Sequence, residues 1–78
     1  MSQRDALPPA QARVLAYLER SFPDAHSARD AAGRLGMDVP TALAALQALH
    51  RLGYARPGPG APTGTPEAEG YEAVTAPR

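Results

Sequence analysis

Residues 27–54 contain two short helical segments joined by a glycine-containing turn, and this arrangement constrains the fold more than any other part of the chain. The stretch reads SARDAAGRLGMDVPTALAALQALHRLGY. Ser27 can cap the first helix, and Asp30 places a carboxylate near the unpaired amides of its first turn. Gly36 suits the left-handed conformation that often follows the last helical residue. We therefore predict a helix over about 28–35.

The second segment has its own start and stop signals. Asp38 is a candidate capping residue, and Pro40 follows in the first turn, where a proline costs no intrahelical hydrogen bond. Gly53 ends the segment for the same reason as Gly36 ends the first. We predict a helix over about 39–52, so that the two helices and the turn between them form a helix-turn-helix.

A third helix is predicted upstream, over about 9–22, after the prolines at positions 8 and 9. Its apolar residues at helical spacing are Val14, Leu15, Leu18 and Phe22. Its polar residues, which we expect to face solvent, are Gln11, Arg13, Glu19 and Arg20. This spacing is typical of a helix packed against a core. Residues 1–6 have no such periodicity and are expected to form a flexible arm.

The composition changes after Gly53. Residues 57–66 read PGPGAPTGTP, which neither a helix nor a central strand accommodates, so we predict a loop. Short segments of strand type flank it at 54–56 and 70–75, and they predict a hairpin over about 54–75. The expected fold is therefore mainly α with a small β-hairpin (α+β), in one domain over residues 7–78.

Composition restricts the function classes. The chain has 78 residues, no cysteine and zero net charge, which excludes disulfides and thiolate metal sites and gives no general argument for nucleic-acid binding. Residues 1–56 carry seven arginines and five acidic residues, so the helical part is mildly basic. No apolar run approaches a membrane span and the N-terminus is too polar for a signal peptide, so we expect a cytoplasmic protein. Neither His26 nor His50 has a companion ligand, and no metal or cofactor is predicted.

These elements resemble the winged helix-turn-helix regulators. The resemblance rests on the order of the three helices, on LxxLxxxGY (Leu46, Leu49, Gly53 and Tyr54) and on the GYxxVT of the second strand, and it covers roughly residues 7–76. It implies a three-helix domain with a wing hairpin. In small bacterial regulators of this type, a dimer binds DNA with the third helix in the major groove. The same fold also serves as a protein-interaction module, and fold alone does not decide between these functions.

The predicted third helix has a core side and an outer side when it is drawn at about 100° per residue. The core side comprises Ala42, Ala45, Leu46, Leu49 and Leu52. The candidate DNA-binding residues on this helix and its flank are Thr41, Ala44, Gln47, Arg51 and Arg56. Thr41 and Gln47 are the expected base contacts, whereas Arg51 and Arg56 are the expected phosphate contacts. Arg29 and Arg34 could contact the DNA backbone from the preceding helix.

Two hypotheses remain open. The first is a DNA-binding transcriptional regulator that acts as a dimer on double-stranded DNA. The second is a module that binds a protein partner through the third helix or the wing, and it is favoured by the alanine-rich outer face and by Glu67 and Glu69 near the predicted wing tip. An enzyme is not expected, because the sequence contains no nucleophile with a base at plausible spacing, no phosphate-binding glycine loop and no paired carboxylates on a rigid element.

Overall fold

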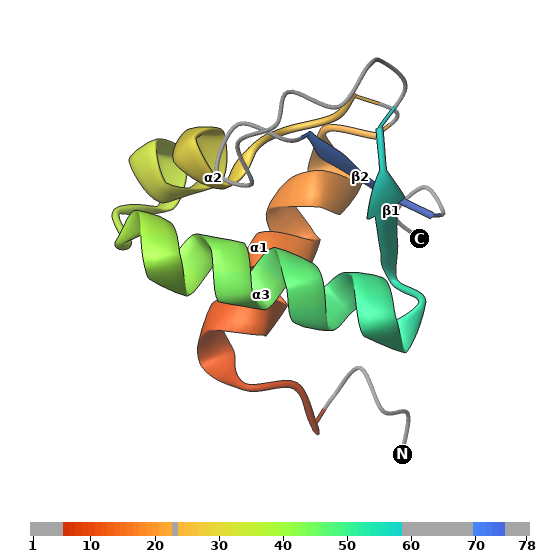
Figure 1. Ribbon diagram of the computed structural model, residues 1–78, viewed down its shortest axis with the longest axis horizontal. Helices are drawn as coiled ribbons and strands as arrows, with labels where there is room; N and C mark the ends of the chain where they lie inside the picture. Colours follow the sequence, from red (N-terminus) through yellow and green to blue (C-terminus); the bar gives the residue numbers. More distant parts are fainter. Residues whose placement is uncertain (1–5, 23, 59–69, 75–78) are drawn as a thin grey trace.

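The computed structural model describes residues 6–22, 24–58 and 70–74, and these form three helices and a two-stranded antiparallel hairpin (Figure 1). The elements are α1 (Pro9–Arg20), α2 (Ala28–Leu35), α3 (Val39–Leu52), β1 (Ala55–Pro57) and β2 (Tyr71–Ala73). The predicted fold class, mainly helical with a small hairpin, is confirmed. Several predicted parts lie outside the described residues: 1–5 of the arm, 59–66 of the loop, Glu67 and Glu69 near the wing tip, and position 75 of the second strand segment.

Helix α2 begins at the predicted capping box. The Ser27 hydroxyl accepts a hydrogen bond from the Asp30 amide at 3.1 Å, and the Asp30 carboxylate accepts one from the Ser27 amide at 3.2 Å. The helix ends as predicted, because Gly36 adopts a φ of 67°. The Met37 amide then donates to the carbonyl of Ala32 at 3.1 Å, which pairs one of the last helical carbonyls.

Helix α3 begins after Asp38 and ends before Gly53, also as predicted. Asp38 occupies the capping position, but its side chain makes no capping hydrogen bond. At the other end Gly53 has a φ of 86°, and the Tyr54 amide donates to the Leu49 carbonyl at 2.9 Å. This termination reverses the chain directly into β1, so the hairpin follows α3 without an intervening loop.

The predicted end of α1 is wrong by two residues. The helix ends at Arg20, and Ser21 and Phe22 turn out of it, with the Phe22 amide bonded to the Glu19 carbonyl at 3.2 Å. Phe22 therefore leaves the apolar stripe and its side chain is 37% exposed. Glu19, expected in solvent, is buried, because α1 is covered by both α3 and β2 and so has a wider buried face than one stripe.

The hairpin pairs Ala55 with Ala73, Arg56 with Glu72, and Pro57 with Tyr71. Pro57, predicted to lie in the loop, is the last residue of β1, an edge position where its missing amide breaks no ladder. All three residues of β2 are buried. The reason is that β2 is also paired on its other side, through two backbone hydrogen bonds of 2.8 Å between Tyr71 and His26.

The core lies where α1, α2 and α3 meet and extends under β2 (Figure 1). Its largest fully buried side chains are Val14, Leu18, Leu46 and Leu49. Leu52 was expected in this core, but its side chain is 39% exposed, because it is the last residue of α3 and lies beyond the contact with the other helices. The core otherwise fixes the orientation of α3, whose opposite side is left to solvent.

Candidate nucleic-acid interface

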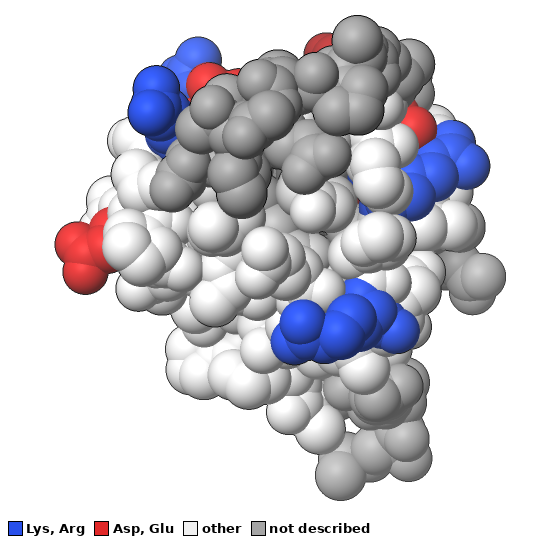
Figure 2. All heavy atoms as spheres, in the orientation of Figure 1, with Lys and Arg blue, Asp and Glu red and all other residues white. Residues whose placement is uncertain are grey.

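The outer side of α3 is a continuous exposed stripe. It consists of Thr41, Ala44, Gln47 and Arg51, all of which are exposed. The opposite side is fully buried, with Ala42, Ala45, Leu46 and Leu49 each 0% exposed. Figure 2 shows a largely uncharged face over α3, apart from a basic patch over its C-terminal half. The helix therefore presents small and uncharged polar groups along most of its length and positive charge at one end.

An aromatic contact joins α3 to the hairpin. The rings of His50 on α3 and Tyr71 on β2 have centroids 5.9 Å apart and are inclined at 58°. Such tilted pairs contribute to packing beyond the apolar area they bury. The contact, together with the direct passage from Gly53 into β1, holds the hairpin beside the C-terminal end of α3.

Arg56, the candidate phosphate contact on β1, is part of an ion pair. Its Nε donates to Oε1 of Glu72 on β2 at 2.9 Å, and the two residues oppose each other across the hairpin. The Glu72 side chain is only 10% exposed, whereas that of Arg56 is 57% exposed. The positive charge of Arg56 is therefore largely balanced within the hairpin, although part of its side chain faces solvent.

Arg29 and Arg34, the candidate backbone contacts on α2, are both exposed and lie at opposite ends of that helix. They line the same hollow, together with Tyr17 on α1 and His26. The C-terminal end of α2 is joined to α1 by Arg13, whose guanidinium donates to the carbonyl of Leu35. This bond satisfies a carbonyl that the end of α2 would otherwise leave unpaired.

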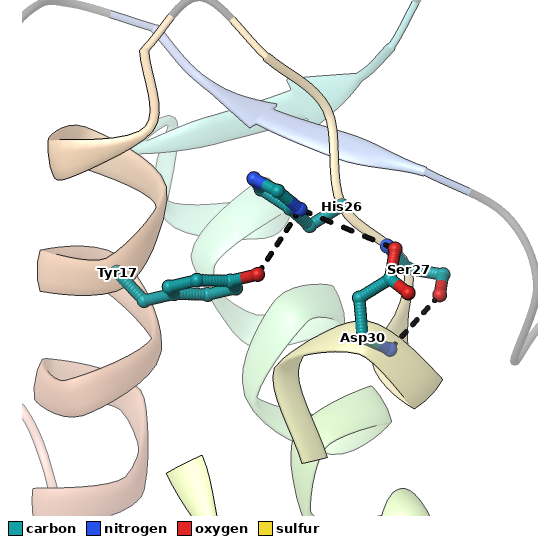
Figure 3. Close-up of polar contacts among 4 residues, drawn as sticks. All are labelled: Tyr17, His26, Ser27 and Asp30. Atoms are coloured by element: carbon teal, nitrogen blue, oxygen red, sulfur yellow. Dashed lines mark hydrogen bonds and ion pairs between the residues drawn. The ribbon is translucent and has the colours of Figure 1, made fainter. Parts of the chain in front are cut away.

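His26, for which no role was predicted from the sequence, connects three elements (Figure 3). Its Nδ1 lies 3.1 Å from the hydroxyl of Tyr17 on α1 and 4.0 Å from Oδ2 of Asp30 on α2. Its backbone amide and carbonyl are both bonded to Tyr71 on β2. The position directly before the capping serine was the only available signal, and it does not reveal pairing with a strand 45 residues away.

The imidazole of His26 is only partly satisfied. Its Nε2 is buried and has no hydrogen-bond partner among the described residues. Its Nδ1 can accept from or donate to the Tyr17 hydroxyl, depending on the tautomer. In either tautomer, one ring nitrogen is left without a described partner, which costs stability relative to a fully bonded ring.

The structure thus arranges the predicted residues in three places. Thr41, Ala44, Gln47 and Arg51 share one face of α3, Arg29 and Arg34 share a hollow beside α2, and Arg56 is paired with Glu72. Within residues 6–22, 24–58 and 70–74, no three histidine, aspartate or glutamate side chains are gathered as a metal would require. Over the same residues, no helix combines the length and apolar character needed to cross a membrane.

No protein-family model matches the chain, and no curated protein is significantly similar to it in sequence.

Proposed function

We propose that the chain is a cytoplasmic winged helix-turn-helix protein that binds double-stranded DNA, acts as a dimer and regulates transcription. The observation that carries the proposal is the outer face of α3. Its exposed stripe of Thr41, Ala44, Gln47 and Arg51 lies on a helix whose other side is anchored in the core. A helix with one rigidly held side and one free side is what insertion into the major groove requires.

The side chains on this stripe suit that role. Gln47 can pair with adenine through two hydrogen bonds, and the methyl group of Ala44 can contact the methyl group of thymine. Thr41 lies in the N-terminal half of the helix, from which base contacts usually come. Arg51 lies in the last turn, where we place a phosphate contact.

We propose a dimer because one copy offers few side chains that can contact bases. Two polar side chains on one α3 provide limited discrimination, since each good bidentate pair contributes about 1–3 kcal/mol. Two copies on adjacent half-sites would double the number of contacts and add the phosphate contacts of Arg29, Arg34 and Arg51.

The experiment is fluorescence anisotropy with a labelled random-sequence duplex across a range of salt concentrations. We expect affinity to fall steeply with salt, and Arg51→Ala to reduce the slope by about 0.9 per binding site. Gln47→Ala should leave that slope unchanged, because a base contact releases no counterion. Arg13→Gln is the matched control, since it removes one positive charge from α1, outside the proposed surface, and leaves an amide that can bond Leu35. Absence of binding at low salt would refute the proposal.

A second candidate function is a protein-interaction module, and a specific observation favours it. Two exposed apolar side chains, Leu52 and Val74, lie at the same end of the molecule, where the Val74 amide donates to the Tyr54 carbonyl at 3.2 Å. The neighbouring arginine of the hairpin is already paired with Glu72. Light scattering on the same samples separates the candidates: a stable oligomer that Leu52→Ser dissociates, without DNA affinity, would favour this function.

A further inference from the structure

Two adjoining hollows lie between α1 and α2, and no residue of α3 is among the residues that line them. Their volumes are about 540 and 400 Å³, and Tyr17, His26 and Arg34 line both. Arg29 and Asp30 line the first, and Arg20 lines the second. Volumes of this order are typical of sites for small molecules.

Positive charge dominates the lining. Arg20, Arg29 and Arg34 come from two different helices, and none of them forms an ion pair with a carboxylate in the described part of the chain. The one acidic side chain of the lining, Asp30, already accepts a hydrogen bond from the amide of Ser27. The guanidinium group is planar and presents paired donors that match the oxygens of a phosphate or a carboxylate.

The wall between the two hollows is aromatic. The rings of Tyr17 and His26 have centroids 4.6 Å apart and are inclined at 37°, and the hydroxyl of Tyr17 points toward His26 (Figure 3). Tyr17 is held by this hydrogen bond, and His26 is held through its backbone by β2. The wall is therefore preorganised on both sides, and it offers π surface next to the arginines.

We propose that this surface, which we call the α1–α2 hollow, binds a small organic anion, namely an aromatic or planar compound that carries a phosphate or a carboxylate. Arg34 is the central ligand because it lines both halves of the hollow. Arg29 adds positive charge to the first half of the hollow and Arg20 to the second, and Tyr17 contacts the ring. The proposal does not depend on base contacts made by α3, but Arg29 and Arg34 are also the proposed phosphate contacts of α2, so the test includes a DNA duplex.

The probe is phenyl phosphate, and its binding is monitored by two-dimensional ¹H–¹⁵N NMR of the full chain. We expect saturable shifts confined to the amides of 17–21 and 26–35, and weaker binding of inorganic phosphate, which lacks the ring. Arg34→Gln should raise the dissociation constant of phenyl phosphate roughly fivefold to tenfold, since it removes a charge-assisted hydrogen bond. Arg34→Lys should recover only part of that loss, because lysine keeps the charge but lacks the planar fork. Arg29→Gln is a second variant should Arg34→Gln not fold.

Arg51→Gln is the matched control, since it removes an exposed arginine from α3 and should not change phenyl phosphate binding. Equal shifts around all arginines, or an equal loss in Arg34→Gln and Arg51→Gln, would overturn the proposal.

Because the phosphates of DNA offer the same chemistry, a duplex is titrated in parallel. If the duplex shifts these amides and phenyl phosphate does not, the hollow is a DNA-backbone contact and the small-anion site is refuted. If phenyl phosphate binds and the duplex does not, the site stands and the DNA proposal fails.

Discussion

Arg56 and Glu72 face each other across the hairpin, and the Nε of the arginine lies 2.9 Å from Oε1 of the carboxylate. The pair is asymmetric, because the Glu72 side chain is 10% exposed while the Arg56 side chain is 57% exposed. A carboxylate this far removed from water depends on its partner, whereas the arginine can be solvated without it. Loss of the pair therefore destabilises the hairpin mainly by leaving the Glu72 carboxylate buried without this partner, and only slightly through Arg56.

This asymmetry predicts the effect of truncating the arginine. Arg56→Ala leaves Glu72 buried without this partner and should lower the free energy of unfolding by about 1–2 kcal/mol. Glu72→Gln should cost less, because the amide oxygen still accepts from the arginine and no charge remains buried. Chemical denaturation followed by circular dichroism measures both, and equal losses in the two variants would contradict the asymmetry.

The same pair predicts a gain in DNA binding, if DNA is the ligand. Glu72→Gln removes the charge that balances Arg56, so the paired strands β1 and β2 carry one net positive charge beside α3. We expect higher affinity for a random-sequence duplex at low salt and a steeper dependence on salt. Glu72→Asp is the control, since it preserves the charge, and a similar gain in that variant would show that electrostatics is not the cause.

The capping box of α2 predicts a local loss of stability. Ser27→Ala removes the acceptor for the Asp30 amide and should lower the free energy of unfolding by about 1 kcal/mol. Ser21→Ala is the matched control, because Ser21 follows α1 and no hydrogen bond of its hydroxyl is among the contacts described. Thermal unfolding of the two variants should separate them by several degrees, since the domain is small.

One glycine inside α2 and one directly after it predict effects of opposite sign. A Cβ added at Gly33 or at Gly36 meets no atom within 4 Å, so neither substitution to alanine is limited by space. Gly36 has a φ of 67°, and Gly36→Ala should cost about 1 kcal/mol or more. Gly33 has a helical conformation, and Gly33→Ala should add about 0.5–1 kcal/mol. Denaturant midpoints of both variants test the prediction, which fails if the two shift in the same direction.

Local chemistry explains why the three helices could be predicted from the sequence. Ser27, Gly36 and Gly53 each act on residues within a few positions, so their effects can be read without knowing the fold. The predictions from the sequence fail at the ends of helices and where burial depends on tertiary contacts. Leu52 fits the apolar stripe of α3, but its burial depended on where the neighbouring helices end. The burial of Glu19 likewise depended on β2, which is more than 50 residues away in sequence.

In the candidate site, too, local patterns could be predicted from the sequence and tertiary contacts could not. The exposed stripe on α3 followed from helical periodicity, because the buried residues of that helix are strongly apolar. The ion pair of Arg56 could not be predicted, since it requires the register of β1 against β2 across a long connection. The role of His26 was missed for a related reason: a single bridging residue between two helices leaves no periodic pattern.

The last prediction concerns the hydrogen bond between Tyr17 and His26, where α1, α2 and β2 meet. Tyr17→Phe keeps the ring and removes only the hydroxyl that lies 3.1 Å from Nδ1 of His26. Because Nε2 already lacks a described partner, Asp30, with its Oδ2 at 4.0 Å, would be the one polar side chain left near the imidazole among the described residues. We expect a loss of about 1 kcal/mol in the free energy of unfolding. The ¹⁵N shifts of the His26 ring should also change, because Nδ1 loses its hydrogen bond to the hydroxyl. Tyr54→Phe is the control, as no hydrogen bond of its hydroxyl is among the contacts described. If Tyr17→Phe leaves both stability and ring shifts unchanged, the hydrogen bond does not hold this junction together.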